Sequence, residues 1–366
     1  MLYVHRLRKE KLGASLSNRA SGIPAAVIFG CIDTALTAAE VDLFADCSPF
    51  GLILFEHNCI DPAQLKDLVT QFQETVGRVD APILIDQEGG RVTRMKPPHW
   101  RHPPPARVFP EIASKDRESG RRAAYLNARL IGRELTSVGI NVDCLPVLDI
   151  PVVGAHEIIG DRALGRDAEM IAELGRALSE GIMAEGVLPI IKHIPGHGRA
   201  KSDSHKELPI VNIPRDELER TDFVPFELMA DMPWAMTAHV LYTAIDAERM
   251  ATISPVIIEE VIREKVGFEG LLLSDDIGME ALSGTKGERA RTILTAGCDL
   301  VLECSGKIED MTEVASTVPK MTEKAMKRAT VAEKLRQDQR VNDGLTTEDA
   351  LKELKDILDA HQVKWA

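Results

Sequence analysis

The sequence predicts a single-domain (β/α)8 TIM barrel, and three observations lead to this fold class. Eight short apolar runs recur along the chain of 366 residues. Segments with helical periodicity lie between most of these runs. Polar and charged residues gather directly after the apolar runs, and in a barrel the carboxyl ends of the strands carry the binding and catalytic groups.

The apolar runs have the length of strands, and they are apolar on both faces. Parallel strands that are covered by helices have this composition, because neither face of the sheet meets water. The expected strands are residues 25–30, 51–55, 82–86, 140–147, 188–193, 234–239, 270–276 and 299–304.

The segments between the strands carry the start and stop signals of helices. One of them begins with Asp61, continues with Pro62 at the first helical position and ends at Gly77, which is the usual order of these residue types along a helix. Others combine long apolar periodicity with a glycine at the end. Helices are expected within residues 34–47, 61–77, 117–139, 166–186 and 254–267.

An open, doubly wound parallel sheet is the competing arrangement. No G-x-G-x-x-G motif follows the first expected strand, and this favours the barrel. We assign residues 1–317 to the barrel. Residues 318–366 are charged and helical in pattern, and we expect them to form a C-terminal helical tail that packs on the barrel.

Composition and charge narrow the class of function. Hydrophobic residues make up 44% of the chain and charged residues 28%, which predicts a folded protein with a sizeable core. A net charge of −13 disfavours nucleic acid and anionic membranes as partners. The six cysteines form no C-x-x-C pair, and the N-terminus is too charged for a signal peptide, so we expect a cytoplasmic protein with reduced thiols.

Polar side chains follow five of the expected strands. An aspartate after a strand is more often a helix cap or a turn former than a catalyst, so no single one of them is informative. Their clustering at one end of the barrel is what indicates a functional site. They are Asp86 and Glu88, then Asp143, Asp149 and Arg162, then Lys192 and His193, then His239, and finally Asp275 and Asp276.

The polar stretch 192–209 after the fifth strand allows three interpretations. A metal site would use His193, His197, Asp203 and His205, but their spacing matches no common ligand template and no cysteine assists. A surface loop explains the charge, but it does not explain the sequence GHG directly after a buried strand. Proton handling fits better, because an aspartate two residues before a histidine could hold its imidazole in one tautomer.

A histidine that acts first as an acid and then as a base needs a reaction partner. Gly196 and Gly198 would let the loop close over a substrate and open again. The best partner is the carboxylate of Asp275 at the end of the seventh strand. A carboxylate nucleophile with a separate acid/base is the arrangement of a retaining glycosidase, in which the acid/base is usually a second carboxylic acid.

Seven segments occur in an order that resembles the family 3 glycoside hydrolases, specifically their β-N-acetylhexosaminidase branch. The most specific are IDQEGGRV at 85–92 and KHIPGHG with DSH at 192–205. The resemblance extends to the single-domain cytosolic enzymes of peptidoglycan recycling. The other segments are LILFEHN, VDCLPVLDI, IGDRALGRD, MTAHVLY and LLLSDDIGMEAL.

The resemblance implies a role for each matching residue. Asp275 is the nucleophile that forms a covalent glycosyl–enzyme intermediate, His205 is the acid/base, and Asp203 polarises it. The residues that bind hydroxyls of the N-acetylglucosamine ring are Asp86, Arg162, Lys192 and His193.

The resemblance also implies the substrate and the partners. The substrate is a small carbohydrate, N-acetylglucosamine β-1,4-linked to 1,6-anhydro-N-acetylmuramic acid with or without a stem peptide. No cofactor and no metal are needed. The expected assembly is a monomer or a weak homodimer, with no nucleic-acid and no membrane partner.

Three features depart from the family pattern or stay open. Ile277 and Gly278 stand where the family more often has Leu and Ser. Trp100 could stack on a sugar, but a structural anchor is the favoured interpretation, and Asp276 could hold a neighbour in place. The rival functions are transfer of the sugar to phosphate, sugar binding without catalysis, and metal-dependent hydrolysis.

Overall fold

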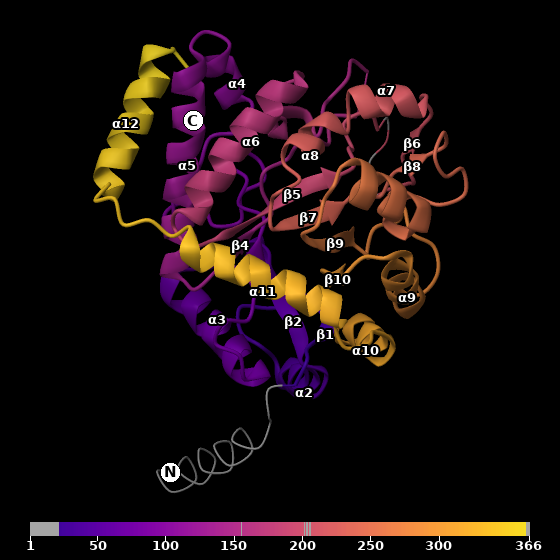
Figure 1. The fold of residues 1–366 in the computed structure, drawn as a ribbon. Coiled ribbons are helices and arrows are strands. Elements are labelled where there is room, and N and C mark those ends of the chain that lie inside the picture. Colours follow the sequence, from indigo (N-terminus) through magenta and orange to yellow (C-terminus); the bar gives the residue numbers. More distant parts are fainter. Residues whose placement is uncertain (1–21, 155, 201, 203, 205, 364–366) are drawn as a thin grey trace, which may run out of the picture.

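Eight parallel strands close into a barrel in this computed structural model, which describes residues 22–154, 156–200, 202, 204 and 206–363 (Figure 1). The order around the barrel is β1-β10-β9-β7-β5-β4-β3-β2, so the predicted fold class is confirmed. The strands are β1 (Ala25–Phe29), β2 (Pro49–Leu54), β3 (Ile83–Ile85), β4 (Val142–Asp143), β5 (Leu188–Ile194), β7 (Trp234–Thr237), β9 (Leu271–Asp276) and β10 (Leu300–Glu303).

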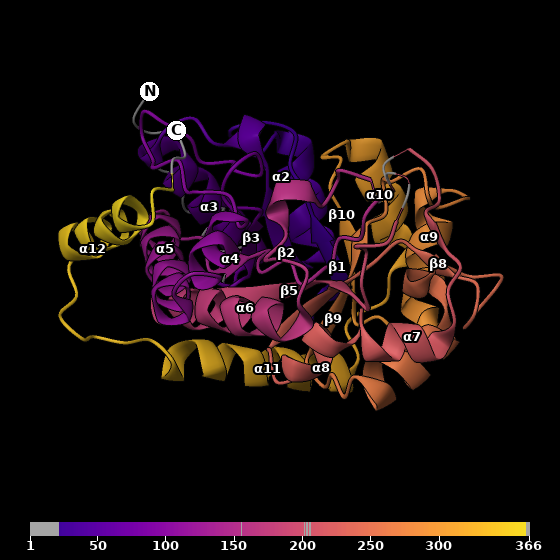
Figure 2. The same ribbon diagram turned by 90° about the horizontal axis from the view of Figure 1, so that it is seen from above.

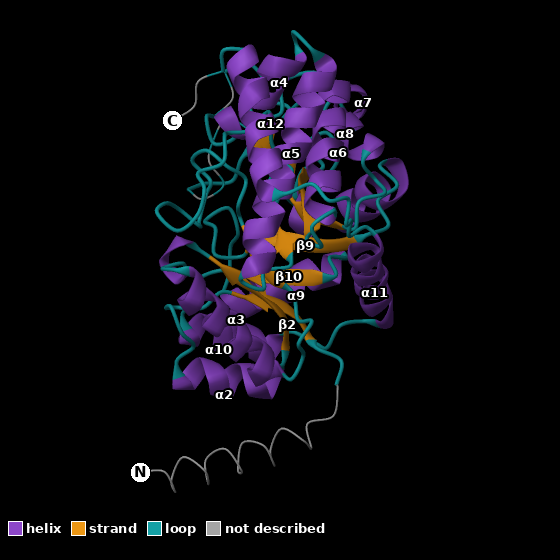
Figure 3. Ribbon diagram, turned by 90° about the vertical axis from the view of Figure 1, so that its left-hand side faces the viewer, coloured by secondary structure: helices purple, strands orange, loops and turns teal. Residues whose placement is uncertain are grey.

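Helices surround the strands, as Figure 3 shows with helices in purple and strands in orange. The helices that connect the barrel strands are α2 (Ala38–Cys47), α3 (Pro62–Val76), α4 (Val108–Ala113), α5 (Arg117–Ser137), α6 (Ala168–Met183), α7 (Arg215–Arg220), α8 (Val224–Leu228), the π-helix η4 (Ile257–Lys265) and α9 (Lys286–Ala296), and α10 (Ile308–Thr317) follows the last strand. Three short 3₁₀ turns are η1 (Glu56–Asn58), η2 (Gly160–Arg162) and η3 (Ala251–Ile253).

The helix boundaries follow from capping residues. Helix α3 starts after Asp61, whose carboxylate accepts hydrogen bonds from the amides of Ala63 and Gln64, and it ends at Gly77 with a φ of 67°. This left-handed conformation favours glycine. Helix α2 begins later than its predicted range of 34–47, because Thr37 forms the N-terminal capping box.

Two layers of apolar side chains result from alternation along the strands. In β1, Val27 and Phe29 pack outward against the helices, whereas Ala26 and Ile28 belong to the cluster inside the barrel. The same alternation in the other strands fills the interior with side chains. The barrel is therefore a packed core, and its functional groups lie at an end of it.

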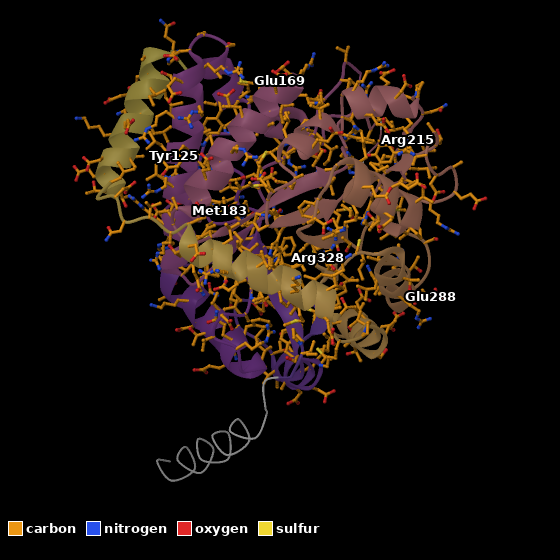
Figure 4. The ribbon with its side chains drawn as sticks, in the orientation of Figure 1. Tyr125, Glu169, Met183, Arg215, Glu288 and Arg328 are labelled. Carbon is orange, nitrogen blue, oxygen red and sulfur yellow. The ribbon has the colours of Figure 1, made fainter. Side chains whose placement is uncertain are left out.

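Helix α11 (Glu323–Asp338) crosses the amino-terminal end of the barrel. Ala325 and Ala332 are buried members of the interior cluster. Arg328, labelled in Figure 4, bonds the carbonyl of Glu269 before β9 and the carboxylate of Asp299 before β10. The helix therefore closes the end of the barrel that is opposite to the polar strand ends.

Helix α12 (Thr347–Ala360) lies outside α5, and a long connection separates it from α11 in Figure 2. Leu354 is buried, and Arg122 pairs with both oxygens of Glu353 at 2.7 Å. Both helices contact the barrel or its helices. The division of the chain at residue 317 stays a prediction.

Two differences from the predicted strands exceed a shift of two residues at an end. The fourth strand is limited to Val142–Asp143, and an isolated parallel bridge from Val147 to Lys192 follows it. A short parallel pair, β6 (Ile210–Val211) with β8 (Leu241–Tyr242), was not predicted. In the described part of the chain, no helix combines the length and the apolar character that a membrane span requires.

Candidate active site

A cavity of about 220 Å³ lies at the carboxyl ends of the barrel strands. Five of the seven predicted site residues line it, namely Asp86, Arg162, Lys192, His193 and Asp275. They come from β3, the turn η2, β5 and β9, which are far apart in sequence and meet only because the barrel closes. The remaining lining residues are Ile53, Phe55, Glu88, Val92, Arg94, Ile158, Met236, Asp276, Met279, Leu302 and Cys304.

Lys192 is the centre of a buried ion-pair cluster. Its Nζ lies 2.8 Å from Oδ1 of Asp86 and 2.7 Å from Oε1 of Glu88, and its side chain is 2% exposed. Arg94 bonds the other oxygen of Asp86 at 3.1 Å. Arg162 holds Glu88 with two hydrogen bonds of 2.8 Å. Two carboxylates and three cations are thus fixed along one side of the cavity.

The cluster keeps its members charged despite burial. Burial alone would raise the pKa of Glu88, but the charges of Arg162 and Lys192 outweigh it and hold the pKa at about 2. For Asp86, burial is likewise outweighed by Lys192 and Arg94, so its pKa lies well below the usual range. Burial opposes the charge of Lys192 too, but the two carboxylates raise its pKa.

Asp275 is the carboxylate at the end of β9, and it is partly exposed to the cavity. Its Oδ1 accepts a hydrogen bond of 2.8 Å from the amide of Asp276. Burial would raise its pKa, but His193, His239 and this amide together lower it, so the carboxylate is ionised at neutral pH. Lys192 contributes less to this lowering than the two histidines and the amide, and Arg162 is engaged with Glu88.

Asp276 supports the strand end. Its Oδ1 accepts hydrogen bonds from the amides of Gly278 at 2.8 Å and Cys304 at 3.2 Å. A Cβ atom at Gly278 would lie 2.7 Å from Oδ2 of Asp276. The departure from the family pattern at Gly278 therefore allows a close approach that holds Asp276 and, next to it, Asp275.

Two further aspartates form hydrogen bonds with residues at the polar ends of the strands. Oδ2 of Asp149 lies 2.7 Å from Nδ1 of His193, and its Oδ1 accepts hydrogen bonds from the amides of His193 and His197. This leaves Nε2 of His193 for a ligand. Asp143 accepts a hydrogen bond from the amide of Gln87, and burial raises its pKa well above the usual range.

Asp203 and His205 lie outside the described residues. Ser204, which stands between them, is buried, and its Oγ lies 3.6 Å from Sδ of Met279. Its carbonyl accepts a hydrogen bond from the amide of Ala281 at 3.3 Å. Ser204 therefore lies against the segment that follows Asp275.

The two glycines of the GHG sequence serve close packing. A Cβ atom at Gly198 would lie 2.0 Å from the carbonyl oxygen of Ile150, and only glycine fits such a contact. Gly196 has a φ of 137°. The structure thus holds Gly198 against the loop after β4 and Gly196 next to Asp222, whereas the sequence suggested that they let the loop move.

The metal interpretation gains no support from the described residues. The rings of His193 and His197 have centroids 5.8 Å apart, and Nδ1 of His193 is engaged with Asp149. No group of three or more histidine, cysteine, aspartate or glutamate residues that could hold a metal ion occurs in the described part of the chain. Asp203 and His205, which complete that interpretation, are not described.

Two other candidates are structural. His239 is buried, with Nε2 3.0 Å from the carbonyl of Asp276 and Nδ1 2.7 Å from Oγ1 of Thr252, and burial lowers its pKa. Trp100 is buried in the main core and does not line the cavity, in agreement with its favoured interpretation as an anchor.

Sequence reasoning gave no role to two charged groups of the site. The sequence marks Glu88 only as a strand-end residue, although it bonds both Lys192 and Arg162. Arg94 lies outside every strand and helix that the sequence predicts, so nothing in the sequence places it beside Asp86. The mixture of acidic and basic residues in segment 86–94 is the sequence feature that could have indicated them.

Comparisons with known proteins all identify the same protein family. The model of the glycosyl hydrolase family 3 N-terminal domain matches residues 29–341. Proteins named β-hexosaminidase from Alkalilimnicola ehrlichii and Methylococcus capsulatus are 38% and 36% identical over 283 and 282 residues. These matches cover 76% of this chain in each case, and 80% and 82% of the two relatives.

Solved structures give the same result. NagZ from Neisseria gonorrhoeae in complex with N-trifluoroacetyl-D-glucosamine superposes with a TM-score of 0.81 at 29% identity, over 93% of this chain and 98% of that one. A glycoside hydrolase family 3 β-N-acetylglucosaminidase from Paenibacillus sp. gives 0.79 at 29% identity, over 91% and 66%.

Proposed function

The chain belongs to glycosyl hydrolase family 3 and is a β-N-acetylhexosaminidase, and on this premise we propose that it is a retaining exo-β-N-acetylglucosaminidase. The bond that it cleaves is the β-1,4 link between N-acetylglucosamine and 1,6-anhydro-N-acetylmuramic acid. The observation that supports the proposal most strongly is the ionised carboxylate of Asp275 in a cavity that also holds Asp86, Arg162, Lys192 and His193.

The proposed reaction has two steps. In the first, Asp275 attacks the anomeric carbon while His205 donates a proton to the leaving oxygen, which yields a covalent glycosyl–aspartate. In the second, His205 takes a proton from water, and the water oxygen displaces Asp275. Asp203 orients the imidazole and stabilises its cationic form. No metal or cofactor takes part in either step.

The ion-pair cluster is proposed to bind ring hydroxyls. An ammonium group has three donors, and Lys192 uses two of them on Asp86 and Glu88, so one remains for a sugar. Nε2 of His193 is likewise left by the bond from Nδ1 to Asp149. Groups fixed in this way select a sugar by its hydroxyls, because a substrate that lacks one leaves a buried polar group unpaired.

We place the activity in the cytoplasm and in peptidoglycan recycling. The relatives are named β-hexosaminidase and NagZ, and all six cysteines are free, as in a reducing compartment. The partner is then a small muropeptide, and neither nucleic acid nor a membrane is involved. A monomer or a weak homodimer is expected.

Replacing His205 with alanine tests the proposed acid/base. For the natural disaccharide, whose leaving group needs a proton, we expect kcat/KM to fall by about 10³-fold. For an aryl N-acetyl-β-glucosaminide with a good leaving group, the fall should be less than about tenfold, because kcat/KM reports the first step and that step then needs little protonation.

The matched control is His361→Ala, on the outside of the molecule at the end of α12. It should leave both substrates unaffected. Equal losses on both substrates with His205→Ala would contradict the acid/base role.

A further inference from the structure

A second cavity, of about 490 Å³, lies beside the candidate active site, and the proposed mechanism does not use it. It is formed by α4, by the loop after β4 and by the residues before α6; Glu169, labelled in Figure 4, marks the first turn of α6. Its lining residues are Arg107, Pro110, Glu111, Ser114, Pro151, Val152, His156, Glu157, Gly160, Ala163, Gly165 and Arg166.

One segment separates the two cavities. Ile158 and Arg162 line the inner cavity, whereas Glu157 and Gly160 line the outer one. Arg91 fixes this segment, because its guanidinium donates to the carbonyls of residues 157, 158 and 159 at 2.7 to 3.1 Å. A ligand that extends out of the active site therefore reaches the outer cavity after it passes residues 157–162.

The outer cavity also borders the loop that leads to His205. The amide of His156 donates to the carbonyl of Ala200 at 2.9 Å, and that of Val152 donates to Gly198 at 3.4 Å. If the inner cavity holds the terminal N-acetylglucosamine, as proposed above, the part of the substrate that extends beyond it is the leaving sugar and its peptide. The outer cavity lies beside this part of the substrate, because residues 157–162 line both cavities.

The lining holds two arginines and apolar surface beside Glu111 and Glu157, and the arginines match the free carboxylates of a short peptide. Arg166 is exposed and has no ion pair with any residue that the structure describes. Arg107 pairs with Glu111 at 2.7 Å, with side chains about half exposed, so a ligand carboxylate can compete for it. Pro110, Pro151 and Val152 supply apolar contact area next to these charges.

From this placement, we infer that the outer cavity is the subsite for the peptide carried by the leaving sugar, with Arg166 and Arg107 binding its carboxylates. The inference rests on the proposed function, because it requires a muropeptide as the substrate. It makes Arg166 a residue that determines specificity and takes no part in bond cleavage.

The test compares kcat/KM for three substrates in the full-length protein. They are the disaccharide with a stem tripeptide, the same disaccharide without a peptide, and an aryl N-acetyl-β-glucosaminide. In Arg166→Glu and Arg107→Glu, the value for the tripeptide substrate should fall about tenfold, because an attractive charge contact becomes a repulsive one. The other two substrates should change by less than twofold, which also shows that the variants fold.

Arg291→Glu is the matched control, because this exposed arginine lies at the opposite end of the barrel. It should change none of the three values. Equal rates on the two disaccharides in wild type and in both variants would overturn the inference and leave the proposed function intact. Failure of the wild type to cleave either disaccharide, with the aryl substrate still cleaved, would overturn both.

Discussion

Replacing Asp275 with asparagine will lower kcat on N-acetyl-β-glucosaminides by about 10⁴-fold or more. An amide of nearly the same shape keeps the packing of the cavity but cannot attack the anomeric carbon, and removal of a catalytic nucleophile typically has an effect of this size. Steady-state kinetics of the purified variant, together with a circular dichroism spectrum, measures the effect and shows whether the fold is retained.

A control variant makes this result specific. Asp231→Asn makes the same change at the surface, where the aspartate pairs with Arg176, and it should keep full activity. Activity of Asp275→Asn above about 1% of the wild type would contradict the assignment, unless the amide is shown by mass spectrometry to have hydrolysed back to the acid.

Replacing Glu88 with alanine will lower the free energy of unfolding by about 3–5 kcal/mol, because it leaves a buried cation without its carboxylate. The side chain of Arg162 is 12% exposed and bonds Glu88 through two nitrogens, and Lys192 would lose one of its two anionic partners. Activity should fall as well, because both cations line the cavity. Urea denaturation at neutral pH measures the change.

The difference in stability should depend on pH. The folded-state pKa of Glu88 is about 2, lower than the usual value of 4.5, so its contribution is present above pH 4.5 and is lost as the pH falls toward 2. The gap between wild type and Glu88→Ala should therefore narrow over that range. Glu111→Ala, in an exposed pair with Arg107, should cost less than about 1 kcal/mol; an equal cost for both variants would contradict the account.

The barrel was predictable because each strand is marked locally. A run such as residues 188–193 is apolar on both faces, and the helix after Asp61 carries its own start and stop signals. The pair of β6 and β8 was not predictable, because each strand has two residues and Ile210 is exposed. Such short pairs depend on where the barrel places their neighbours.

The site was predictable in part, for a related reason. Asp86, Lys192, His193 and Asp275 stand at the carboxyl ends of strands, and in a closed parallel barrel all these ends lie on the same face. The partners that keep these groups charged could not be predicted from the sequence. Asp149 and His193 are 44 residues apart, and Glu88 bonds an arginine 74 residues away. No sequence periodicity relates such pairs, so only the folded chain identifies them.

The central claim is that the end of β9 supplies the group that bonds to the sugar. Incubation with a slow 2-acetamido fluorosugar, followed by proteolysis and mass spectrometry, tests it directly. We predict a glycosyl adduct on the peptide that contains Asp275, and tandem fragmentation should place it on that residue rather than on Asp276. An adduct on a peptide from any other part of the chain would contradict the claim.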